Sequence, residues 1–156
     1  MDIEIQQGTA ADIEAIAQFQ VDMALESEGT LLDRQRVLRG VTAVMEDPGK
    51  GRYIVAKVGD KVIGSMMLTM EWSDWNDGWY WWIQSVYVLP DYRGKGAFTA
   101  MYNSLKDAAR QENVRELRLY VDKTNFSAQR RYQKSGMHES HYLMYEETVP
   151  PISQRP

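Results

Sequence analysis

The 156-residue chain contains no cysteine, and this absence removes several kinds of site at once. Without thiols there is no disulfide framework, no thiolate metal centre and no nucleophilic cysteine. The lack of thiols fits a reducing cytosol, so we expect a cytoplasmic protein. The length is that of one ordinary domain, which can bury most of its apolar surface without cross-links.

Long apolar runs and an excess of positive charge are also missing. No stretch approaches the ~18 apolar residues that a membrane-spanning helix needs, and the acidic start at residues 1–4 does not resemble a signal peptide. The 18 Lys and Arg residues against 22 Asp and Glu residues give a formal net charge of −4. Phosphate binding rests on many basic contacts, so we expect no nucleic-acid partner, and we expect no membrane partner.

Hydrophobic periodicity predicts one α+β domain over residues 1–148 and a flexible tail at 149–156 that holds three of the five prolines. A small acidic loop is expected at 26–30, between the first two helices. The predicted elements, in order, are a strand near residue 3, helices at 9–25 and 33–47, strands at 52–58, 61–70 and 79–88, a helix from the glycine-rich turn to 112, a strand at 117–121, a helix at 125–136 and a strand at 138–147.

A glycine-rich turn follows the strand that ends at Val88. Arg93-Gly94-Lys95-Gly96 leads into a helix whose first backbone N–H groups have no partner within the helix and lie at its positive end. Such a turn suits an anion, and the glycines let a ligand approach the backbone. Neither the P-loop spacing nor the dinucleotide fingerprint is present, so the turn indicates a phosphate site but no nucleotide hydrolase.

Residues 86–97, VYVLPDYRGKGA, resemble the acetyl-coenzyme A (acetyl-CoA) motif of the GNAT family of N-acetyltransferases, in which Arg/Gln-x-x-Gly-x-Gly/Ala wraps the pyrophosphate. Residues 125–137 resemble the second motif of the family, Asn-x-x-Ala-x-x-x-Tyr-x-x-x-Gly-Phe. The stretch 71–88 is similar to a small-molecule-type branch. The resemblance implies an α+β fold in which about four helices flank a mixed, mostly antiparallel sheet of six to seven strands.

The resemblance also implies an acyltransferase that takes its acetyl group from acetyl-CoA and needs no metal. The strand residues would pair through their backbone with the pantetheine arm. Phe98 stands at the final Gly/Ala position of the first motif, so its side chain is expected to point into the sheet-helix core. The residues assigned to the cofactor are Val86, Tyr87, Val88, Arg93, Gly94, Lys95, Gly96, Ala97, Phe98 and Asn125.

Tyr132 matches the family tyrosine that protonates the departing sulfur, although it could also be a core tyrosine packed beside Ala128. A phenol of pKa about 10 is a reasonable donor to a thiolate whose conjugate acid lies near 8.5. Many relatives have Glu where this chain has Gln84, and an amide cannot take a proton at neutral pH, so Gln84 would orient a water or the substrate. The candidates for the general base are Glu26, Glu28, Glu71 and Asp74.

All five tryptophans lie between residues 72 and 82. They either pack on a buried strand or line an aromatic and acidic pocket for a cationic amine. The second interpretation assigns the substrate to Glu28, Trp72, Asp74, Trp75 and Trp79.

The resulting hypothesis is transfer of an acetyl group to a small cationic primary amine by direct attack, since no cysteine is present to carry the acyl group. Two alternatives stay open. A non-catalytic acyl-CoA-binding sensor is favoured by Gln84, and a protein or peptide acetyltransferase would need an open groove. The acceptor itself, the acyl-chain preference and the choice between monomer and homodimer are not determined by the sequence.

Overall fold

The computed structural model describes residues 1–152 and contains two compact units, Met1–Tyr120 and Val121–Pro156. The first unit holds the sheet and three α-helices, and the second holds the fourth. No helix within residues 1–152 is long and apolar enough to cross a membrane.

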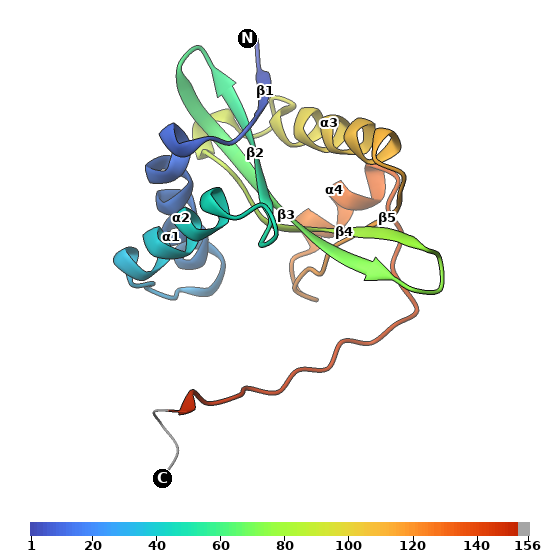
Figure 1. Cartoon of the computed structure of the whole chain (residues 1–156). Helices are drawn as coiled ribbons and strands as arrows, with labels where there is room; N and C mark the ends of the chain where they lie inside the picture. The colour runs from blue at the N-terminus through green and yellow to red at the C-terminus, as the bar shows by residue number, and fades with distance from the viewer. Residues whose placement is uncertain (153–156) are drawn as a thin grey trace. The chain divides into compact units, whose positions relative to one another are not determined.

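Five strands form one sheet in the first unit, in the order β1-β2-β3-β4-β5 (Figure 1). Neighbouring strands are antiparallel from β1 to β4, whereas β5 runs parallel to β4. The mixed, mostly antiparallel sheet confirms the predicted α+β class. The strands are β1 Glu4–Gln7, β2 Arg52–Val58, β3 Lys61–Ser73, β4 Gly78–Val88 and β5 Val114–Arg118.

Residues 1–152 form four α-helices, as predicted, and two short 3-10 helices. Asp33 caps α2 by accepting hydrogen bonds from the backbone N–H groups of Gln35 and Arg36. Asn125 caps α4 in the same way through Ala128. Both caps confirm the sequence prediction. The helices are η1 Ala10–Asp12, α1 Ile13–Glu28, α2 Arg34–Glu46, η2 Pro90–Tyr92, α3 Ala97–Gln111 and α4 Phe126–Lys134.

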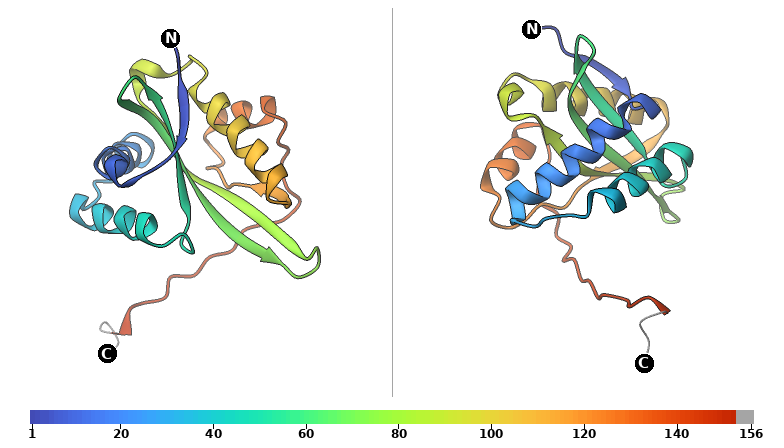
Figure 2. Two further views of the ribbon diagram at one scale, coloured as in Figure 1. Left: turned by 45° about the horizontal axis from the view of Figure 1, so that its top comes forward. Right: turned by 90° about the vertical axis from the view of Figure 1, so that its left-hand side faces the viewer.

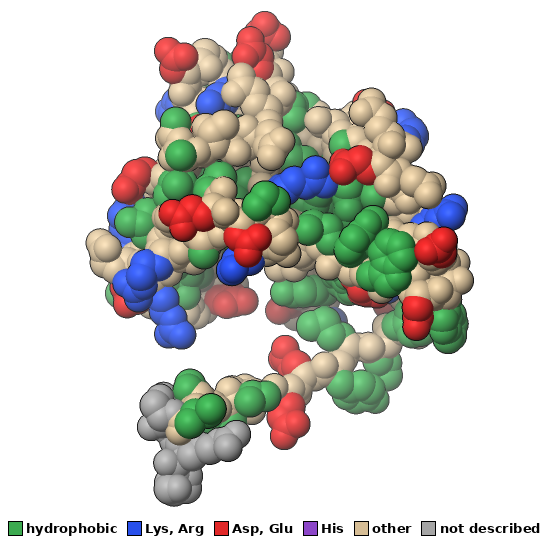
Figure 3. Space-filling model, in the orientation of Figure 1, with side chains coloured by type: hydrophobic (Ala, Val, Ile, Leu, Met, Phe, Trp, Pro, Cys, Tyr) green, Lys and Arg blue, Asp and Glu red, His purple; other side chains and the backbone are tan. Residues whose placement is uncertain are grey.

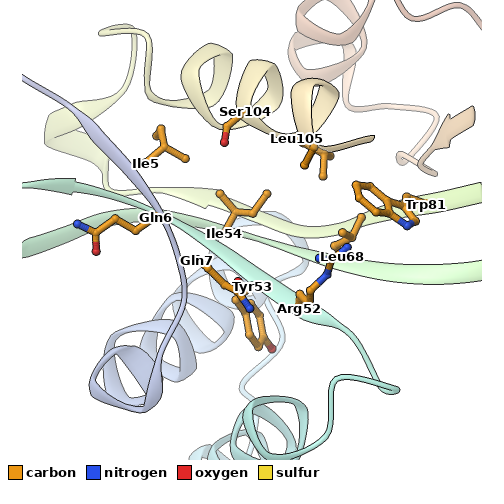
Figure 4. Close-up of a pocket in the computed structure, with 11 residues that line it drawn as sticks. Ile5, Gln6, Gln7, Arg52, Tyr53, Ile54, Leu68, Trp81, Ser104 and Leu105 are labelled. Atoms are coloured by element: carbon orange, nitrogen blue, oxygen red, sulfur yellow. The ribbon is translucent and has the colours of Figure 1, made fainter. Parts of the chain in front are cut away.

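Helices cover both faces of the sheet in the first unit, with α1 and α2 on one face and α3 on the other (Figure 2). Tyr53 and Val55 of β2 belong to a buried cluster with Ile16 of α1. Ile54, between them in the sequence, points to the opposite face, toward Leu105 of α3 (Figure 4). Side chains alternate between the two faces of a strand, so the helices on each face of the sheet pack on a different set of β2 residues.

A cavity of about 160 Å³ remains between α3 and the sheet (Figure 4). Ser104 and Leu105 line it on the helix side, and Ile54 lines it on the sheet side. Arg52 also lines the cavity, and its guanidinium lies 4.8 Å from the centre of the Trp81 ring. No residue of the glycine-rich turn borders this cavity.

The sheet has five strands instead of the predicted six to seven, and the predicted strand at 138–147 is absent. Within residues 1–152 this stretch pairs with no other strand. A strand forms only where a neighbour accepts its backbone hydrogen bonds, so apolar alternation alone was not sufficient. Of the predicted tail, residues 149–151 have no regular structure, and residues 153–156 lie outside the described residues.

Two boundaries also differ from the sequence prediction. The expected acidic loop at 26–30 is wrong at its start, because α1 continues through Glu28 and ends only at Gly29. Gly29 has φ 63°, the left-handed conformation that commonly terminates helices. The last strand of the sheet lies at 114–118 instead of 117–121, because the tight turn through Asn113, φ 54°, brings Val114 directly opposite Trp79.

Candidate active site

A bulge interrupts β4 shortly before its end. Met67 of β3 is opposite Gln84, whereas Ser65 is opposite Tyr87, so two residues of β4 stand against one of β3. The extra residue is accommodated at Ser85, whose φ of 52° is left-handed. The bulge redirects the strand just before the residues that were assigned to the cofactor.

Beyond the bulge, β4 has no strand partner on its β5 side within residues 1–152. β5 pairs only with Trp79–Trp82, although β4 continues to Val88. An unpaired strand edge offers backbone donors and acceptors to any extended chain that lies beside it. Val86, Tyr87 and Val88 lie in this stretch, as the predicted backbone pairing requires.

The turn between β4 and α3 leaves open space at both of its glycines. Gly94 and Gly96 have φ values of 73° and 89°, and a Cβ at either would meet no atom within 4 Å. Gly96 caps α3, and the first bond of the helix runs from the Ala100 N–H to the Gly96 carbonyl at 2.9 Å. The N–H groups from Gly94 to Ala97 come before this bond and suit an anion, whereas the Arg93 N–H donates to the Pro90 carbonyl at 3.2 Å.

The two basic side chains of the turn bind the protein itself. The Arg93 Nε donates to the Val88 carbonyl at 2.9 Å, and the Lys95 Nζ donates to the Asp91 carbonyl at 2.9 Å. Both side chains therefore brace the turn. Their positive charge stays beside the glycines, but direct contacts to an anion fall to the backbone.

Phe98 takes the orientation that the sequence predicts. It is buried at the start of α3, with only 6% of its surface exposed, and its ring stacks on that of Tyr102 at a centroid distance of 5.8 Å. The bulky side chain therefore leaves the glycine-rich turn open. Ala97, before it, is also buried.

Glu26 ties the last turns of α1 to this site. Its carboxylate accepts a hydrogen bond from the Arg93 Nη2 at 2.7 Å and another from the Tyr87 hydroxyl at 2.8 Å. The Tyr87 ring also packs against Phe19 of α1, with centroids 5.2 Å apart. We call Glu26, Arg93 and Tyr87 the carboxylate latch.

The sequence prediction assigned Tyr87 to the cofactor through its backbone only, and it gave Phe19 no part in the site. The signal that points to them is helical spacing, because Phe19 and Glu26 are seven residues apart and therefore lie on one face of α1. Both then face the same strand residue.

The contacts of the latch move the pKa values of Glu26 and Tyr87 in opposite directions. The Arg93 hydrogen bond, helped by that of Tyr87, holds the pKa of Glu26 below its ordinary value of 4.5. Burial, followed by the hydrogen bond to Glu26, raises the pKa of Tyr87 to about 12. A carboxylate with a lowered pKa is a weaker proton acceptor, so Glu26 is better suited to hold Arg93 than to act as the general base.

Gln84 and the candidate bases Glu71 and Glu28 also lie in the first unit. Gln84 Nε2 donates to the Thr69 hydroxyl at 2.8 Å, next to the bulge. Glu71 accepts from Trp82 Nε1 at 2.9 Å and pairs with Arg118 at 3.7 Å, so its carboxylate is engaged by the sheet. Glu28 is exposed at the end of α1.

The predicted tryptophan pocket is not formed within the described residues. Trp72, Trp75 and Trp79 lie at the far end of the β3–β4 hairpin and are 50%, 91% and 42% exposed. Trp79 precedes Val86 by seven residues, or roughly 20 Å at about 3.3 Å per strand residue, and Asp74 lies in the exposed turn beside Trp75. The structure therefore does not bring these four residues to the bulge.

The buried members of the tryptophan block fit the packing interpretation instead. Trp81 is 2% exposed, and Trp82 is half-buried on the sheet. Trp72 and Trp79 contact each other edge to face, with ring centroids 5.0 Å apart, so even the exposed pair is held by a mutual contact.

The second unit carries the remaining predicted residues on α4. Asn125 Oδ1 accepts from the Ala128 N–H at 3.1 Å. Tyr132 lies two helical turns further on, and burial raises its pKa above the ordinary 10.0. Its phenol is therefore protonated at neutral pH, which is the state that a proton donor needs.

A model of the acetyltransferase (GNAT) family matches residues 14–137, a span that includes the bulge, the glycine-rich turn and α4. The chain belongs to the GNAT acetyltransferase family. The comparison with curated proteins gave no match.

Solved structures agree with this GNAT assignment. A possible acetyltransferase from Clostridium difficile 630 is 43% identical, with a TM-score of 0.90, and the match covers 96% of this chain and 99% of that one. A predicted acetyltransferase with acetyl-CoA from Clostridium acetobutylicum has the same fold at 17% identity, with a TM-score of 0.73 and coverage of 94% and 96%.

An integron cassette protein from the mobile metagenome of Cole Harbour Salt Marsh shares the fold at 22% identity, with a TM-score of 0.81 and coverage of 96% and 93%.

Residues 1–152 hold no group of three or more His, Asp or Glu side chains arranged to bind a metal ion. The predicted lack of a metal requirement remains a prediction.

The latch predicts how Glu26 titrates. In the wild-type protein the Glu26 carboxyl should titrate below 4.5, and in Arg93→Ala its pKa should rise, because the largest cause of the lowering is removed. Since the folded pKa is the lower one, the latch stabilises the fold above about pH 4.5, and this contribution is lost as the pH falls through the folded pKa.

Carbon-13 NMR titration of the carboxyl carbon measures both values. Arg36→Ala on α2 is the matched control, because the Arg36 side chain is exposed and the Glu26 carboxylate is bonded by Arg93 and Tyr87 instead. A Glu26 titration that Arg93→Ala leaves unchanged contradicts the latch.

Proposed function

We propose that this protein transfers the acetyl group of acetyl-CoA to a primary amine, of a small cationic kind, by direct attack. The observation that carries the proposal is the unpaired edge of β4 after the bulge, followed at once by the glycine-rich turn that opens α3. A strand edge next to a cluster of N–H donors suits a ligand that joins an extended amide chain to a pyrophosphate. Membership of the GNAT family supports the acyl transfer.

The residues at this site fit acetyl-CoA. The backbone of Val86–Val88 would pair with the pantetheine arm, and the N–H groups from Gly94 to Ala97 would hold the pyrophosphate. The Phe98 side chain is buried away from the turn, and a Cβ at Gly94 or Gly96 would meet no atom within 4 Å, so the turn leaves room for a ligand. Asn125 is proposed as a further contact beside its capping role. When bound, acetyl-CoA supplies an activated thioester carbonyl.

The chain's own residues would then carry the steps around that carbonyl. The Val86 N–H, just past the bulge, would stabilise negative charge on the carbonyl oxygen. Gln84 would orient the amine or a water that takes its proton, and Tyr132 would donate its hydroxyl proton to the sulfur. One N–C bond forms and one C–S bond breaks. The proton lost from nitrogen leaves through water, and Tyr132 regains a proton from water, so the products are the amide and coenzyme A with a free thiol.

Asp22 adds a negative charge near the end of β4 beside the Glu26–Arg93 ion pair, and this added charge supports a cationic acceptor. Glu26 and Asp22 both raise the pKa of Tyr87 through their charge, so both carboxylates lie near this end of the strand. An alkyl ammonium of pKa about 10.4 would be attracted there and must lose a proton before it attacks. The exposed tryptophans at the far end of the hairpin do not contribute to this argument.

The test is an assay of thiol release from acetyl-CoA with a panel of amines, with the product identified by an intact-mass gain of one acetyl group. We expect turnover on small diamines and polyamines at neutral to mildly alkaline pH. Tight acetyl-CoA binding without turnover on any amine contradicts an enzyme and favours the sensor. Turnover confined to peptides or proteins contradicts a small acceptor.

Gly96→Val should weaken acetyl-CoA binding at least tenfold, or about 1.4 kcal/mol. The branched side chain both strains the left-handed backbone and fills the open space at the turn. Isothermal titration calorimetry measures the affinity. Gly59→Val in the β2–β3 hairpin is the matched control, since Gly59 has φ 58° and equally open surroundings. Equal affinity of the two variants would refute the pyrophosphate placement.

Tyr132→Phe should lower kcat by about 100-fold while the affinity for acetyl-CoA stays nearly unchanged, because only the proton donor is lost. The alkaline limb of the pH profile of kcat should change as well, since burial raises the pKa of the wild-type Tyr132 phenol and the variant has no phenol to titrate. Tyr145→Phe, at an 89% exposed position, is the control. Wild-type rates across the pH range in Tyr132→Phe remove Tyr132 as the acid.

A further inference from the structure

The cavity between α3 and the sheet, here named the α3 cavity, has the features of a second small-molecule site (Figure 4). The apolar side chains of Leu68, Trp81 and Leu105 line it, and each is no more than 2% exposed. Gln7, which also lines it, is exposed, so the cavity opens to solvent. An apolar interior with a polar edge is typical of ligand sites. The lining includes no residue of Val86–Val88, so this cavity is apart from the proposed acetyl-CoA site.

The volume of the α3 cavity sets the size of the ligand. The cavity measures about 160 Å³. An apolar cavity of about 150 Å³ engineered into another protein binds benzene, so the α3 cavity has room for one six-membered ring. The Trp81 side chain lines it, and aromatic rings pack favourably edge to face or with their faces offset. Size and lining together favour an aromatic ring over a polar ligand.

The charge of the α3 cavity comes from Arg52, the one ionic side chain among its lining residues within 1–152. The Arg52 guanidinium lies over the Trp81 ring, 4.8 Å from its centroid. It also donates to Glu112, whose Oε2 accepts from Nη1 at 3.5 Å and from Nη2 at 3.4 Å. Strong charge-assisted bonds measure about 2.7–2.9 Å. Two long contacts to one oxygen leave the guanidinium able to form shorter, parallel bonds with a second carboxylate.

We propose that the α3 cavity binds a small aromatic monocarboxylate, with its ring against Trp81 and its carboxylate paired with Arg52. On the face seen in Figure 3, hydrophobic side chains reach the surface where α3 lies beside the sheet, next to side chains of both charges. A neutral aromatic molecule would gain nothing from the guanidinium, and an aromatic amine would be repelled by it. The site does not depend on the proposed acetyl transfer.

Three probes that share a ring and differ in charge give the first test: benzoate, benzyl alcohol and benzylammonium. Nitrogen-15 NMR follows the indole N–H signal of Trp81, which Trp81→Phe identifies. Benzoate should shift this signal with a Kd of roughly 0.1–1 mM, about tenfold below that of benzyl alcohol, and benzylammonium should leave it in place. The signals of Trp72, Trp75 and Trp79 should not move. Equal affinity for benzoate and benzyl alcohol, or a Trp81 signal unmoved by benzoate, overturns the proposal.

Arg52→Met tests the carboxylate contact, because it removes the charge and keeps a long apolar side chain. The affinity for benzoate should fall about tenfold, to that for benzyl alcohol, while the affinity for benzyl alcohol stays within about twofold of the wild-type value. Arg39→Met is the matched control, since Arg39 is exposed and its helix, α2, covers the other face of the sheet. Benzoate binding that Arg52→Met leaves unchanged contradicts the proposal.

Ser104→Leu tests the location, because Ser104 lines the cavity from α3 and a leucine there fills the space. Benzoate and benzyl alcohol should both lose their binding, while the affinity for acetyl-CoA stays within about twofold of the wild-type value. Asn103→Leu, at the exposed neighbouring position, is the control.

Circular dichroism checks that the filled variant is folded, and Ala108→Leu, at another lining position on α3, carries the same expectation if it is not. A folded, filled variant that binds benzoate as the wild type does overturns the location. A folded variant that loses acetyl-CoA together with benzoate overturns the separation of the two sites.

Discussion

The incomplete pairing of β4 is the constraint on which the rest of the site depends. The strand is bonded on both sides from Trp79 to Trp82, and beyond the bulge at Ser85 it is bonded, among residues 1–152, to β3 alone. A fully paired strand would have no backbone groups left for a ligand, and a strand unpaired on both sides would lack a fixed position. β4 is therefore held rigidly at its start and left open on one edge at its end.

The glycine-rich turn, between β4 and α3, is likewise held in place by the protein while its backbone faces outward. Its basic side chains bind the carbonyls of Val88 and Asp91, and Arg93 also binds Glu26. The cations therefore set the shape of the turn, while the backbone N–H groups remain free to face an anion. Glu26 connects this arrangement to α1, so the end of α1 meets β4 and the turn, whose Tyr87 and Arg93 lie 61 and 67 residues later in the sequence.

Local signals predicted much of the fold. Asp33 and Asn125 act within one helical turn, so each cap pattern maps directly to a structure. The end of α1 was still misplaced, because acidic residues at 26–28 are equally compatible with a loop and with a last helical turn. The strand at 138–147 failed for a different reason, since strand formation depends on a neighbour that is not local.

The sequence by itself determined the family, the position of the glycine-rich turn and the inward direction of Phe98, because these follow from the order and spacing of neighbouring residues. Only the tertiary structure decided that Glu26 is held by Arg93, 67 residues away, and that Trp72, Trp75 and Trp79 lie far along the hairpin from the bulge. The clustering of the tryptophans in the sequence suggested a pocket. The pairing of β3 with β4 instead places Trp72, Trp75 and Trp79 at the exposed end of a hairpin. The physical reason is that a strand spaces its residues linearly, so closeness in sequence becomes distance along a sheet.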